Sequence, residues 1–263
     1  MRALITGASS GIGRELALLL ACRGAELILV ARGEAALSAL TGDLRASGAA
    51  AVDFLAVDLT DSNAVDTIVA LLGDRPLDLL VNNAGCGDYG RFQDIEWDRY
   101  SKSLQLNMCA LTALTHALLP GMLLSNRGCI VNVASTAAFM PLPLMAAYAA
   151  SKSYVLSLSQ ALQFELRHTQ IRVMALCPGA TRTGFAAAAA AESSNNFSES
   201  NTASPAAVAA FALKKIDGGA TGIVVHGFKN RLSTVFTRLV PDYLVMLLAN
   251  RVMRSDAHSI NPM

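Results

Sequence analysis

The sequence predicts an α/β protein, a single domain built on a doubly wound parallel sheet of about seven strands with helices on both faces. Short runs rich in leucine and β-branched residues alternate with longer stretches of helical periodicity, which is typical of βαβ units. The short runs are mostly apolar, as expected of strands that helices cover on both sides. The 263 residues are 53% hydrophobic and 16% charged, enough to bury a large core.

The elements follow one another in a regular order. Strands are expected at residues 3–6, 26–31, 52–57, 77–81, 129–133, 172–176 and 222–225. Helices are expected at residues 12–23, 35–46, 63–72, 97–124, 147–167 and 205–216. Asp61 and Ser204 are the expected N-caps, and Pro120 with Gly121 should bend or end the fourth helix. The run 186–204, alanines and then a Ser/Asn/Glu mixture, predicts a mobile loop or weak helix.

Charge and cysteine usage exclude several classes. The 21 Lys and Arg balance 20 Asp and Glu without a basic cluster, which argues against nucleic-acid binding. Five scattered cysteines without a CxxC pair, and four scattered histidines, predict neither a disulfide framework nor a metal site. They fit a reducing compartment, and the N-terminus leaves no room for a signal peptide, so a cytoplasmic location is expected.

Two charge-free stretches, residues 103–126 and 128–151, are long enough to resemble membrane spans. Both contain asparagine and proline, at Asn107, Pro120, Asn132 and Pro141 among others. We interpret them as buried interior and expect no transmembrane segment.

A glycine-rich turn, TGASSGIG at residues 6–13, joins the first strand to the first helix. Gly7 permits the tight turn, Gly11 lets the backbone approach a pyrophosphate, and Gly13 allows the helix to pack closely on the strand. The helix N-terminus adds unpaired N–H donors and the positive end of its dipole. The sequence therefore predicts a dinucleotide phosphate site formed by Gly7, Ser9, Ser10, Gly11, Ile12 and Gly13.

A second motif, YAASK, places Tyr148 and Lys152 one helical turn apart, on the same face of the predicted helix 147–167. The lysine charge favours the phenolate, so we expect it to lower the pKa of Tyr148 toward the range of a general acid and base. On an isolated surface helix such a pair would be two solvated side chains. The glycine turn upstream favours the catalytic interpretation.

The spacings TGxxxGxG and YxxxK resemble the short-chain dehydrogenase/reductase family, and the resemblance extends over nearly the whole chain. Asn82-Asn83-Ala84-Gly85 matches the family's NNAG motif, and Pro178-Gly179 followed by Thr183 matches its nicotinamide-flanking segment. The resemblance implies a Rossmann-like fold and hydride transfer between a nicotinamide and a carbonyl or alcohol carbon. It implies cofactor contacts from Asp58, Asn83, Ala84, Tyr148, Lys152, Pro178, Gly179 and Thr183.

The resemblance also implies the catalytic roles. Ser135, thirteen positions before Tyr148, would hydrogen-bond the substrate oxygen, and Lys152 would also hold the nicotinamide ribose. Asn107 would anchor a proton relay through water. Taken alone, an asparagine at this position is more often a satisfied polar residue within a helix.

The choice of nicotinamide depends on the end of the second strand. An NAD-selecting enzyme places an acidic residue near this point, but the chain has Ala31 followed by Arg32. The guanidinium of Arg32 suits a 2′-phosphate, although a single arginine can also face water. The absence of the acid favours NADP(H).

We therefore predict an NADP(H)-dependent oxidoreductase that interconverts a carbonyl and a secondary alcohol. The regions that should shape the pocket, residues 138–145, 179–204 and the C-terminal stretch, are apolar, which favours a lipophilic substrate. Two alternatives are weaker. A sugar-nucleotide epimerase or dehydratase would carry TGxxGxxG and a longer C-terminal domain, and an NADP-binding regulatory or scaffold protein would have lost the serine, tyrosine or lysine.

The last expectations concern organisation and assembly. Residues 1–228 form the nucleotide-binding and catalytic domain, with an insert at 180–204, and residues 229–263 form a helical C-terminal extension. Long apolar helices at 97–124 and 147–167 predict a homodimer or homotetramer. Short amphipathic helices in the extension must be covered by the pocket, by another subunit or by a membrane surface. The first two are favoured because the segment is not rich in Lys and Arg.

Overall fold

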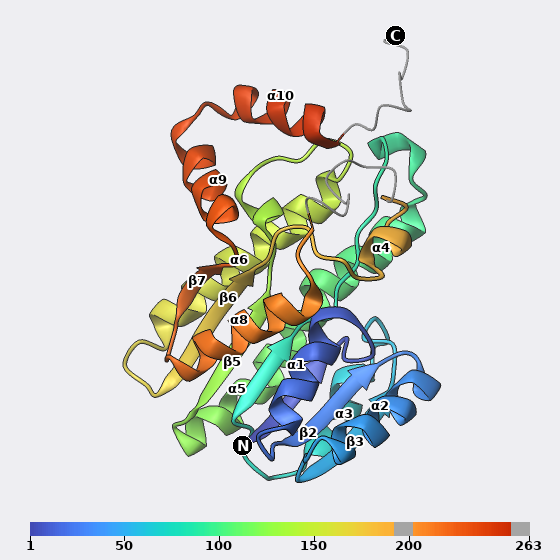
Figure 1. The fold of residues 1–263 in the computed structure, drawn as a ribbon, viewed down its shortest axis with the longest axis vertical. Helices are drawn as coiled ribbons and strands as arrows, with labels where there is room; N and C mark the ends of the chain where they lie inside the picture. Colours follow the sequence, from blue (N-terminus) through green and yellow to red (C-terminus); the bar gives the residue numbers. More distant parts are fainter. Residues whose placement is uncertain (192–201, 254–263) are drawn as a thin grey trace.

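The structure is a computed structural model, and it describes residues 1–191 and 202–253. Within these ranges one all-parallel sheet has the strand order β3-β2-β1-β4-β5-β6-β7 (Figure 1). The strands are β1 (Arg2–Thr6), β2 (Glu26–Ala31), β3 (Ala51–Ala56), β4 (Leu79–Asn82), β5 (Gly128–Val133), β6 (Ile171–Cys177) and β7 (Gly222–Val225). The predicted doubly wound, Rossmann-like sheet is confirmed, with each expected run forming a strand.

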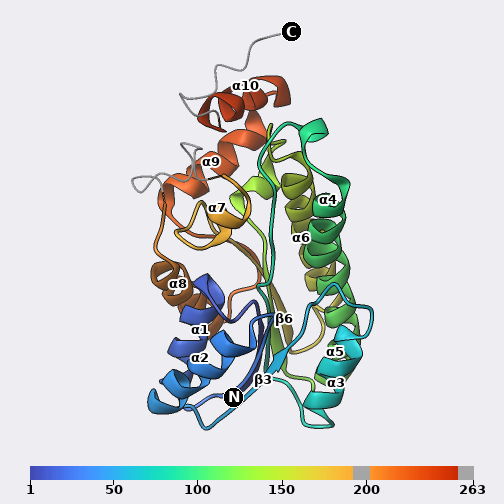
Figure 2. The ribbon, with the colours of Figure 1, turned by 90° about the vertical axis from the view of Figure 1, so that its right-hand side faces the viewer.

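Helices cover both faces of this sheet. They are α1 (Gly11–Ala21), α2 (Glu34–Ala46), α3 (Ala64–Leu72), α4 (Trp97–Leu104), α5 (Leu111–Ser125), α6 (Ala146–Glu165), α7 (Phe185–Ala188), α8 (Pro205–Asp217), α9 (Phe228–Leu239) and α10 (Asp242–Met253). Three short helical segments join them: η1 (Phe92–Asp94), η2 (Gln105–Ala110) and η3 (Thr136–Phe139). Figure 2 shows α1, α2 and α8 on one side of the sheet and α3, α4, α5 and α6 on the other.

Successive residues of β1 point to opposite faces of the sheet, and both faces are buried. Ile5 belongs to the core cluster that includes Leu16 of α1 and Val208 of α8. Leu4 belongs to the second cluster, with Ile68 of α3. Each fully buried side chain of this size contributes about 1.5–3 kcal/mol to folding. Two cores therefore hold the sheet between its helical layers.

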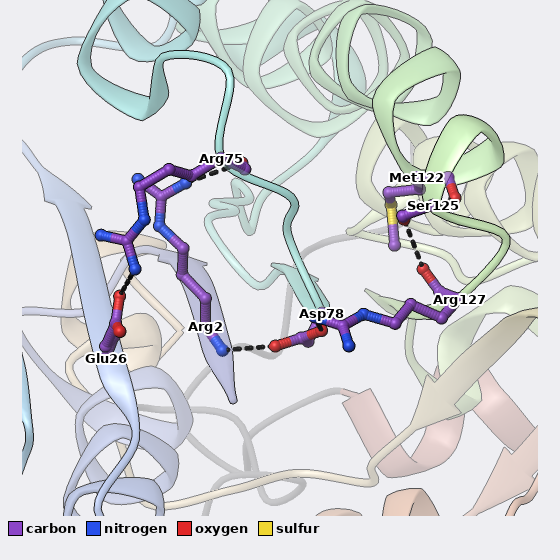
Figure 3. Close-up of polar contacts among 7 residues, drawn as sticks. All are labelled: Arg2, Glu26, Arg75, Asp78, Met122, Ser125 and Arg127. Carbon is purple, nitrogen blue, oxygen red and sulfur yellow. Dashed lines mark hydrogen bonds and ion pairs between the residues drawn. The ribbon is translucent and has the colours of Figure 1, made fainter.

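A charged cluster fixes the amino ends of the strands (Figure 3). The guanidinium of Arg2, 8% exposed, donates to the backbone carbonyl of Arg75 at 2.8 Å, and the Arg2 amide donates to Asp78 at 2.8 Å. Asp78 also pairs with Arg127 at 3.0 Å, and Arg75 pairs with Glu26. The cluster ties β1, β2, β4 and β5 together at the edge of the sheet away from the carboxyl ends of the strands.

The long fourth helix differs from the prediction in two ways. It does not end at Pro120, because α5 continues to Ser125 with the proline inside it. A π-helical segment, η2, separates α4 from α5, and no feature of the sequence pattern predicted it. Of the two predicted N-caps, Ser204 accepts a hydrogen bond from the amide of Ala207 at 3.2 Å, as expected. The Asp61 prediction is wrong, because Asn63 occupies the N-cap of α3.

The charge-free stretch 103–126 is not wholly buried, contrary to expectation. The helix spanning Trp97–Ser125 is long and apolar enough to cross a membrane by length and composition alone. In the most apolar 18-residue stretch of this helix, 33% is buried inside the structure. Leu114 is buried against the sheet, whereas Leu124 is 91% exposed. One side of the helix therefore packs on the domain and the other is accessible.

The insert and the extension are described in part. Residues 185–188 form the short helix α7, and Thr181 pairs with Ala203 in an isolated parallel bridge. The rest of the predicted mobile run, residues 192–201, lies outside the described residues, as do residues 254–263. The expected amphipathic helices of the extension form α9 and α10, at the end of the molecule far from the N-terminus (Figure 2). The division of the chain at residue 228 stays a prediction.

Candidate active site

A cavity of about 970 Å³ lies at the carboxyl ends of the strands. Residues that follow β1 to β6 line it, which is where an open α/β sheet binds its ligands. Most of the predicted site residues meet there: Gly7, Ser9, Ser10, Gly11, Ile12, Arg32, Asp58, Asn83, Ala84, Ser135, Tyr148, Lys152, Pro178, Gly179 and Thr183. Gly13 and Asn107 are not on the cavity wall and lie behind it.

The first turn requires glycine for two different reasons. Gly7 adopts φ +63°, a left-handed conformation that side chains disfavour. At Gly13 the obstacle is contact, since a β-carbon would lie 2.6 Å from both Asn83 Nδ2 and the Gly7 carbonyl oxygen. The chain therefore reverses tightly and brings the N-terminus of α1 to the cavity, as a phosphate site needs.

Thr6 and Asn83 brace this turn against β4. The Thr6 hydroxyl accepts hydrogen bonds from the amides of Asn83 and Ala84, both at 3.0 Å. The Asn83 side chain donates to the carbonyls of Thr6 at 2.9 Å and Gly7 at 3.1 Å. Sequence reasoning placed Asn83 at the cofactor and assigned no role to Thr6. The threonine's place at the start of the glycine motif is the signal that could have found it.

Arg32 and Asp58 lie on the wall near the carboxyl ends of β2 and β3. Asp58 Oδ1 accepts hydrogen bonds from the amide and the hydroxyl of Thr60, both at 2.9 Å. The hydrogen bond from the Thr60 backbone amide is the main reason that the pKa of Asp58 lies below its usual value, and the Arg32 charge acts in the same direction. Arg32 is exposed and Ala31 is buried beside it, so the described wall presents a cation where an NAD-selecting enzyme presents an acid.

Ser135 and Tyr148 come from different elements. Ser135 follows β5 as the N-cap of η3, and its hydroxyl accepts a hydrogen bond from the amide of Ala137 at 3.1 Å. Tyr148 lies in the first turn of α6, with its ring centroid 5.0 Å from that of Phe185 in α7. Both residues line the cavity. The main effect on the pKa of the Tyr148 phenol is a rise caused by burial, and the Ser135 hydroxyl acts in the opposite direction.

Lys152 is almost fully buried, and its ammonium donates to the carbonyl of Val133 at 2.9 Å. The nitrogen lies 5.8 Å from the centroid of the Tyr148 ring. Burial lowers the pKa of Lys152 to about 8 and raises the pKa of Tyr148 to about 12. The expected lowering of the tyrosine pKa by the lysine is therefore wrong for this structure: loss of water around the phenol is the largest cause and raises the pKa, and the charge of Lys152 is not among the causes that lower it.

Asn107 lies in the π-helical segment η2 and is 1% exposed. Its side-chain oxygen accepts from the amide of Cys86 at 3.0 Å, and its nitrogen donates to the Cys86 carbonyl at 2.8 Å. The same nitrogen donates to the Ser151 hydroxyl at 3.0 Å, which in turn donates to the carbonyl of Tyr148 at 2.7 Å. Asn107 thus joins the β4 loop to the catalytic turn of α6. Sequence reasoning missed Ser151, although it lies inside the YAASK motif.

Gly85 explains how these groups come close. A β-carbon at this position would lie 3.1 Å from Asn107 Oδ1 and 3.2 Å from Lys152 Nζ. The glycine therefore leaves room for the amide oxygen and the ammonium on one side of the β4 loop. Such a pair can hold a water molecule or a hydroxyl between an acceptor and a donor.

The other half of the cavity has an uncharged, largely apolar wall. Residues of the predicted pocket regions contribute here, among them Met140, Met145 and Phe185. The last two helices complete the wall with Asn230, Ser233, Phe236, Thr237, Val245, Leu248, Ala249 and Met253. α9 packs closely against Gly179, where a β-carbon would lie 2.5 Å from the Asn230 side chain.

The fold and the site together define a class, the dinucleotide-binding α/β oxidoreductases. The sequence model described as short chain dehydrogenase matches residues 1–194. The chain therefore belongs to the short-chain dehydrogenase/reductase family.

Individual relatives are similar over most of the chain. An uncharacterized oxidoreductase of Myxococcus xanthus is 36% identical, over 74% of this chain and 75% of that protein. A very-long-chain 3-oxoacyl-CoA reductase of Laccaria bicolor is 34% identical, over 65% of this chain and 52% of that protein. A solved structure, a short-chain dehydrogenase from Sphingobium yanoikuyae in complex with NADPH, is 32% identical with a TM-score of 0.82, covering 100% of this chain and 98% of that one.

Proposed function

We propose that the protein is an NADP(H)-dependent oxidoreductase that interconverts a carbonyl and a secondary alcohol on a lipophilic substrate. One observation carries the proposal: Ser135, Tyr148 and Lys152 line the same cavity as the glycine turn of a nucleotide site. Bound NADPH would supply the hydride. The protein's own groups then have to bind the carbonyl oxygen and give it a proton.

The hydroxyls of Ser135 and Tyr148 are placed for that task. Both would donate hydrogen bonds to the carbonyl oxygen and stabilise the negative charge that develops on it. The raised pKa of Tyr148, about 12, keeps the phenol protonated at neutral pH, so the tyrosine is the proton donor. Lys152 contributes its positive charge, and the hydrogen bonds of Asn107 and Ser151 hold the catalytic turn.

NADP(H) is the better match of the two nicotinamides. The Sphingobium structure contains NADPH, and this chain has the exposed guanidinium of Arg32 at the ribose end of the cavity wall. Asp58 lies on the same wall, but its Oδ1 is committed to Thr60. A 2′-phosphate next to Arg32 would gain a charge-assisted hydrogen bond.

The substrate half of the cavity supports a lipophilic carbonyl. The wall contributed by residues 140–145 and by α7, α9 and α10 is apolar or uncharged among the described residues. A sugar nucleotide would need cations for its pyrophosphate at this wall, so the epimerase alternative is not favoured. The Laccaria relative is a reductase of long acyl chains by its name, which agrees with an apolar wall.

A substrate panel tests the proposal. We expect NADPH oxidation, followed at the absorbance of the reduced nicotinamide, with long-chain ketones, 3-oxoacyl thioesters or steroid ketones, and less with short polar ketones. Apolar contact with the wall should raise kcat/KM by about threefold to fourfold for each added CH₂ group, at about 0.8 kcal/mol apiece. Turnover of none of these carbonyls, in a protein that binds NADPH, would contradict the proposal.

The pH dependence of reduction should follow Lys152. Its pKa of about 8 means that the ammonium is charged at neutral pH and loses its proton as the pH rises through 8, while Tyr148 stays protonated up to about 12. Reduction should therefore be constant below about pH 7 and fall to about a tenth of its plateau by about pH 9, if the charge is essential. The measurement is kcat/KM for a ketone between pH 6 and 10.

The control for this profile is Lys152→Arg, whose charge does not titrate in that range. Its residual activity should lack the fall near pH 8. A wild-type rate that stays level to pH 10 would show that the charge of Lys152 does not contribute to reduction.

We also propose a homo-oligomer, a dimer or tetramer, formed through the helices that the sequence singled out. Trp97 of α4, Leu124 of α5 and Phe164 of α6 are 68%, 91% and 65% exposed. These helices lie on one side of the sheet (Figure 2), where a second copy could cover them. A cytoplasmic location likewise stays a prediction.

A further inference from the structure

The outward side of the last two helices is apolar. Of the large apolar side chains that are exposed among the described residues, half lie on α9 and α10, although these helices are a small part of the chain. We call this set the C-terminal apolar face: Phe228, Leu232, Val235, Phe236, Leu239, Tyr243, Leu244, Leu247 and Leu248. Figure 2 shows the two helices at the end of the molecule beyond the carboxyl ends of the strands.

The polarity of α9 is the reverse of that of an ordinary surface helix. Its apolar positions recur at the spacing of one helical face, which a globular protein normally turns to its core. Here that face points outward, with Leu232 63% and Leu239 79% exposed. The residues turned inward are polar, and Thr234 and Thr237 are buried. The helix leaves its apolar side uncovered by the described residues, and an exposed apolar face of this kind is typical of a binding surface.

This face continues into the active-site cavity. Phe236 and Leu248 line the cavity and are 48% and 53% exposed, so they form part of its rim. Val245 and Ala249, on the inner side of α10, also line the cavity and are buried. A lipophilic molecule could pass along side chains of one kind from the outer face to the catalytic groups.

Cations flank the apolar side chains. Lys229, Arg231 and Arg251 are exposed on the two helices, and Asp242 is the one acidic residue in their sequence. The segment is not rich in Lys and Arg, but its basic residues outnumber its one acidic residue, so its net charge is positive whereas that of the whole chain is close to zero. Apolar side chains with basic neighbours suit the boundary between anionic lipid headgroups and acyl chains.

We propose that the C-terminal apolar face docks on an anionic lipid bilayer and that the cavity takes its substrate from that bilayer. The second part rests on the proposed function, and the first does not. A second copy of the chain fits less well, because a partner seated on this face would also cover Phe236 and Leu248 and close the rim of the cavity. The match to the family model ends at residue 194, so it does not extend to α9 or α10.

Vesicle flotation tests the docking. Full-length protein is mixed with vesicles of phosphatidylcholine alone or with phosphatidylglycerol, and the floating fraction is measured. The test variant is Leu232→Ser with Leu239→Ser, two exposed positions outside the cavity wall. Its matched control is Val69→Ser with Leu71→Ser, two exposed positions of α3. Wild type and control should float with the anionic vesicles, and the test variant should partition about tenfold less or weaker still.

Three results would overturn the docking proposal. The first is wild-type protein that does not float with anionic vesicles, and the second is a test variant that floats as well as wild type. The third comes from light scattering: a lower mass for the test variant than for the control would make this face a subunit interface.

Activity measurements test substrate uptake from the bilayer separately from docking on the bilayer. With a water-soluble ketone, wild type and both double variants should have the same turnover. With a ketone dissolved in vesicles, the test variant should lose about tenfold in kcat/KM, in proportion to its weaker partitioning. Equal rates on the vesicle-borne ketone would contradict delivery from the bilayer. Failure to reduce any ketone would contradict the proposed function and leave the flotation result intact.

Discussion

Tyr148→Phe should lower turnover by about a hundred- to ten-thousandfold and leave NADPH binding unchanged, because only a group that donates the proton is removed. The phenyl ring keeps its place beside Phe185, whose centroid lies 5.0 Å away, and Lys152 keeps its hydrogen bond to the Val133 carbonyl. The cavity therefore keeps its shape. Single-turnover reduction of a ketone gives the rate, and fluorescence titration with NADPH gives the affinity.

The same substitution at Tyr154 is the matched control. Tyr154 lies on the same helix, and its hydroxyl is 2.9 Å from that of Thr112, away from the cavity wall. Tyr154→Phe should retain wild-type turnover. If Tyr148→Phe kept most of its kcat, the tyrosine would not be the proton donor, and the proposed mechanism would need another acid.

The strands could be predicted because their signal is local. A buried parallel strand needs a short apolar run bounded by turn residues, and runs such as residues 26–31 and 222–225 carry both features. The end of the fourth helix was also predicted closely, at residue 124 against the observed Ser125, but the effect of Pro120 could not be predicted in the same way. Pro120 removes one backbone donor near the end of the helix, but packing of Leu114 and Met122 into the core holds the flanking turns helical.

The residues that form the site could be predicted from the sequence, but the direction in which the pKa of Tyr148 shifts could not. Helical spacing paired Tyr148 with Lys152, the family resemblance added Ser135, and the structure brings all three to one cavity. The direction of the tyrosine pKa depends on how much water the folded chain leaves around the phenol, and spacing along a helix does not contain that information. The brace by Thr6 and the link through Ser151 likewise depend on contacts between distant segments.

In the C-terminal extension, too, the helices could be predicted from the sequence but their orientation could not. Periodicity predicted amphipathic helices, and α9 and α10 confirm them. It did not predict which side of α9 faces inward, because Thr234 and Thr237 make a polar side that an ordinary surface helix would expose. In the structure this polar side packs close to Gly179 through Asn230 and lines the cavity with Ser233 and Thr237.

Arg32→Ala should weaken NADPH binding by about ten- to a hundredfold, the effect of one lost charge-assisted contact of roughly 1.5–3 kcal/mol. NADH has no 2′-phosphate, so the affinity for NADH should stay the same. The ratio of NADPH affinity to NADH affinity should therefore fall by the same factor, about ten- to a hundredfold. Because Arg32 is exposed, salt should reduce the wild-type preference as well.

The control for this experiment is Arg14→Ala. Arg14 lies on α1 close to the glycine turn but outside the cavity wall, and it pairs with Glu15 and Asp43. Arg14→Ala removes the same charge from the same region and leaves the proposed phosphate site unchanged, so the preference for NADPH over NADH should not change. Titration of wild type and both variants with NADPH and NADH at two ionic strengths separates the local contact from the general field. A wild-type protein that already prefers NADH would show that Ala31 and Arg32 do not select the 2′-phosphate, and the NADP(H) assignment would fail.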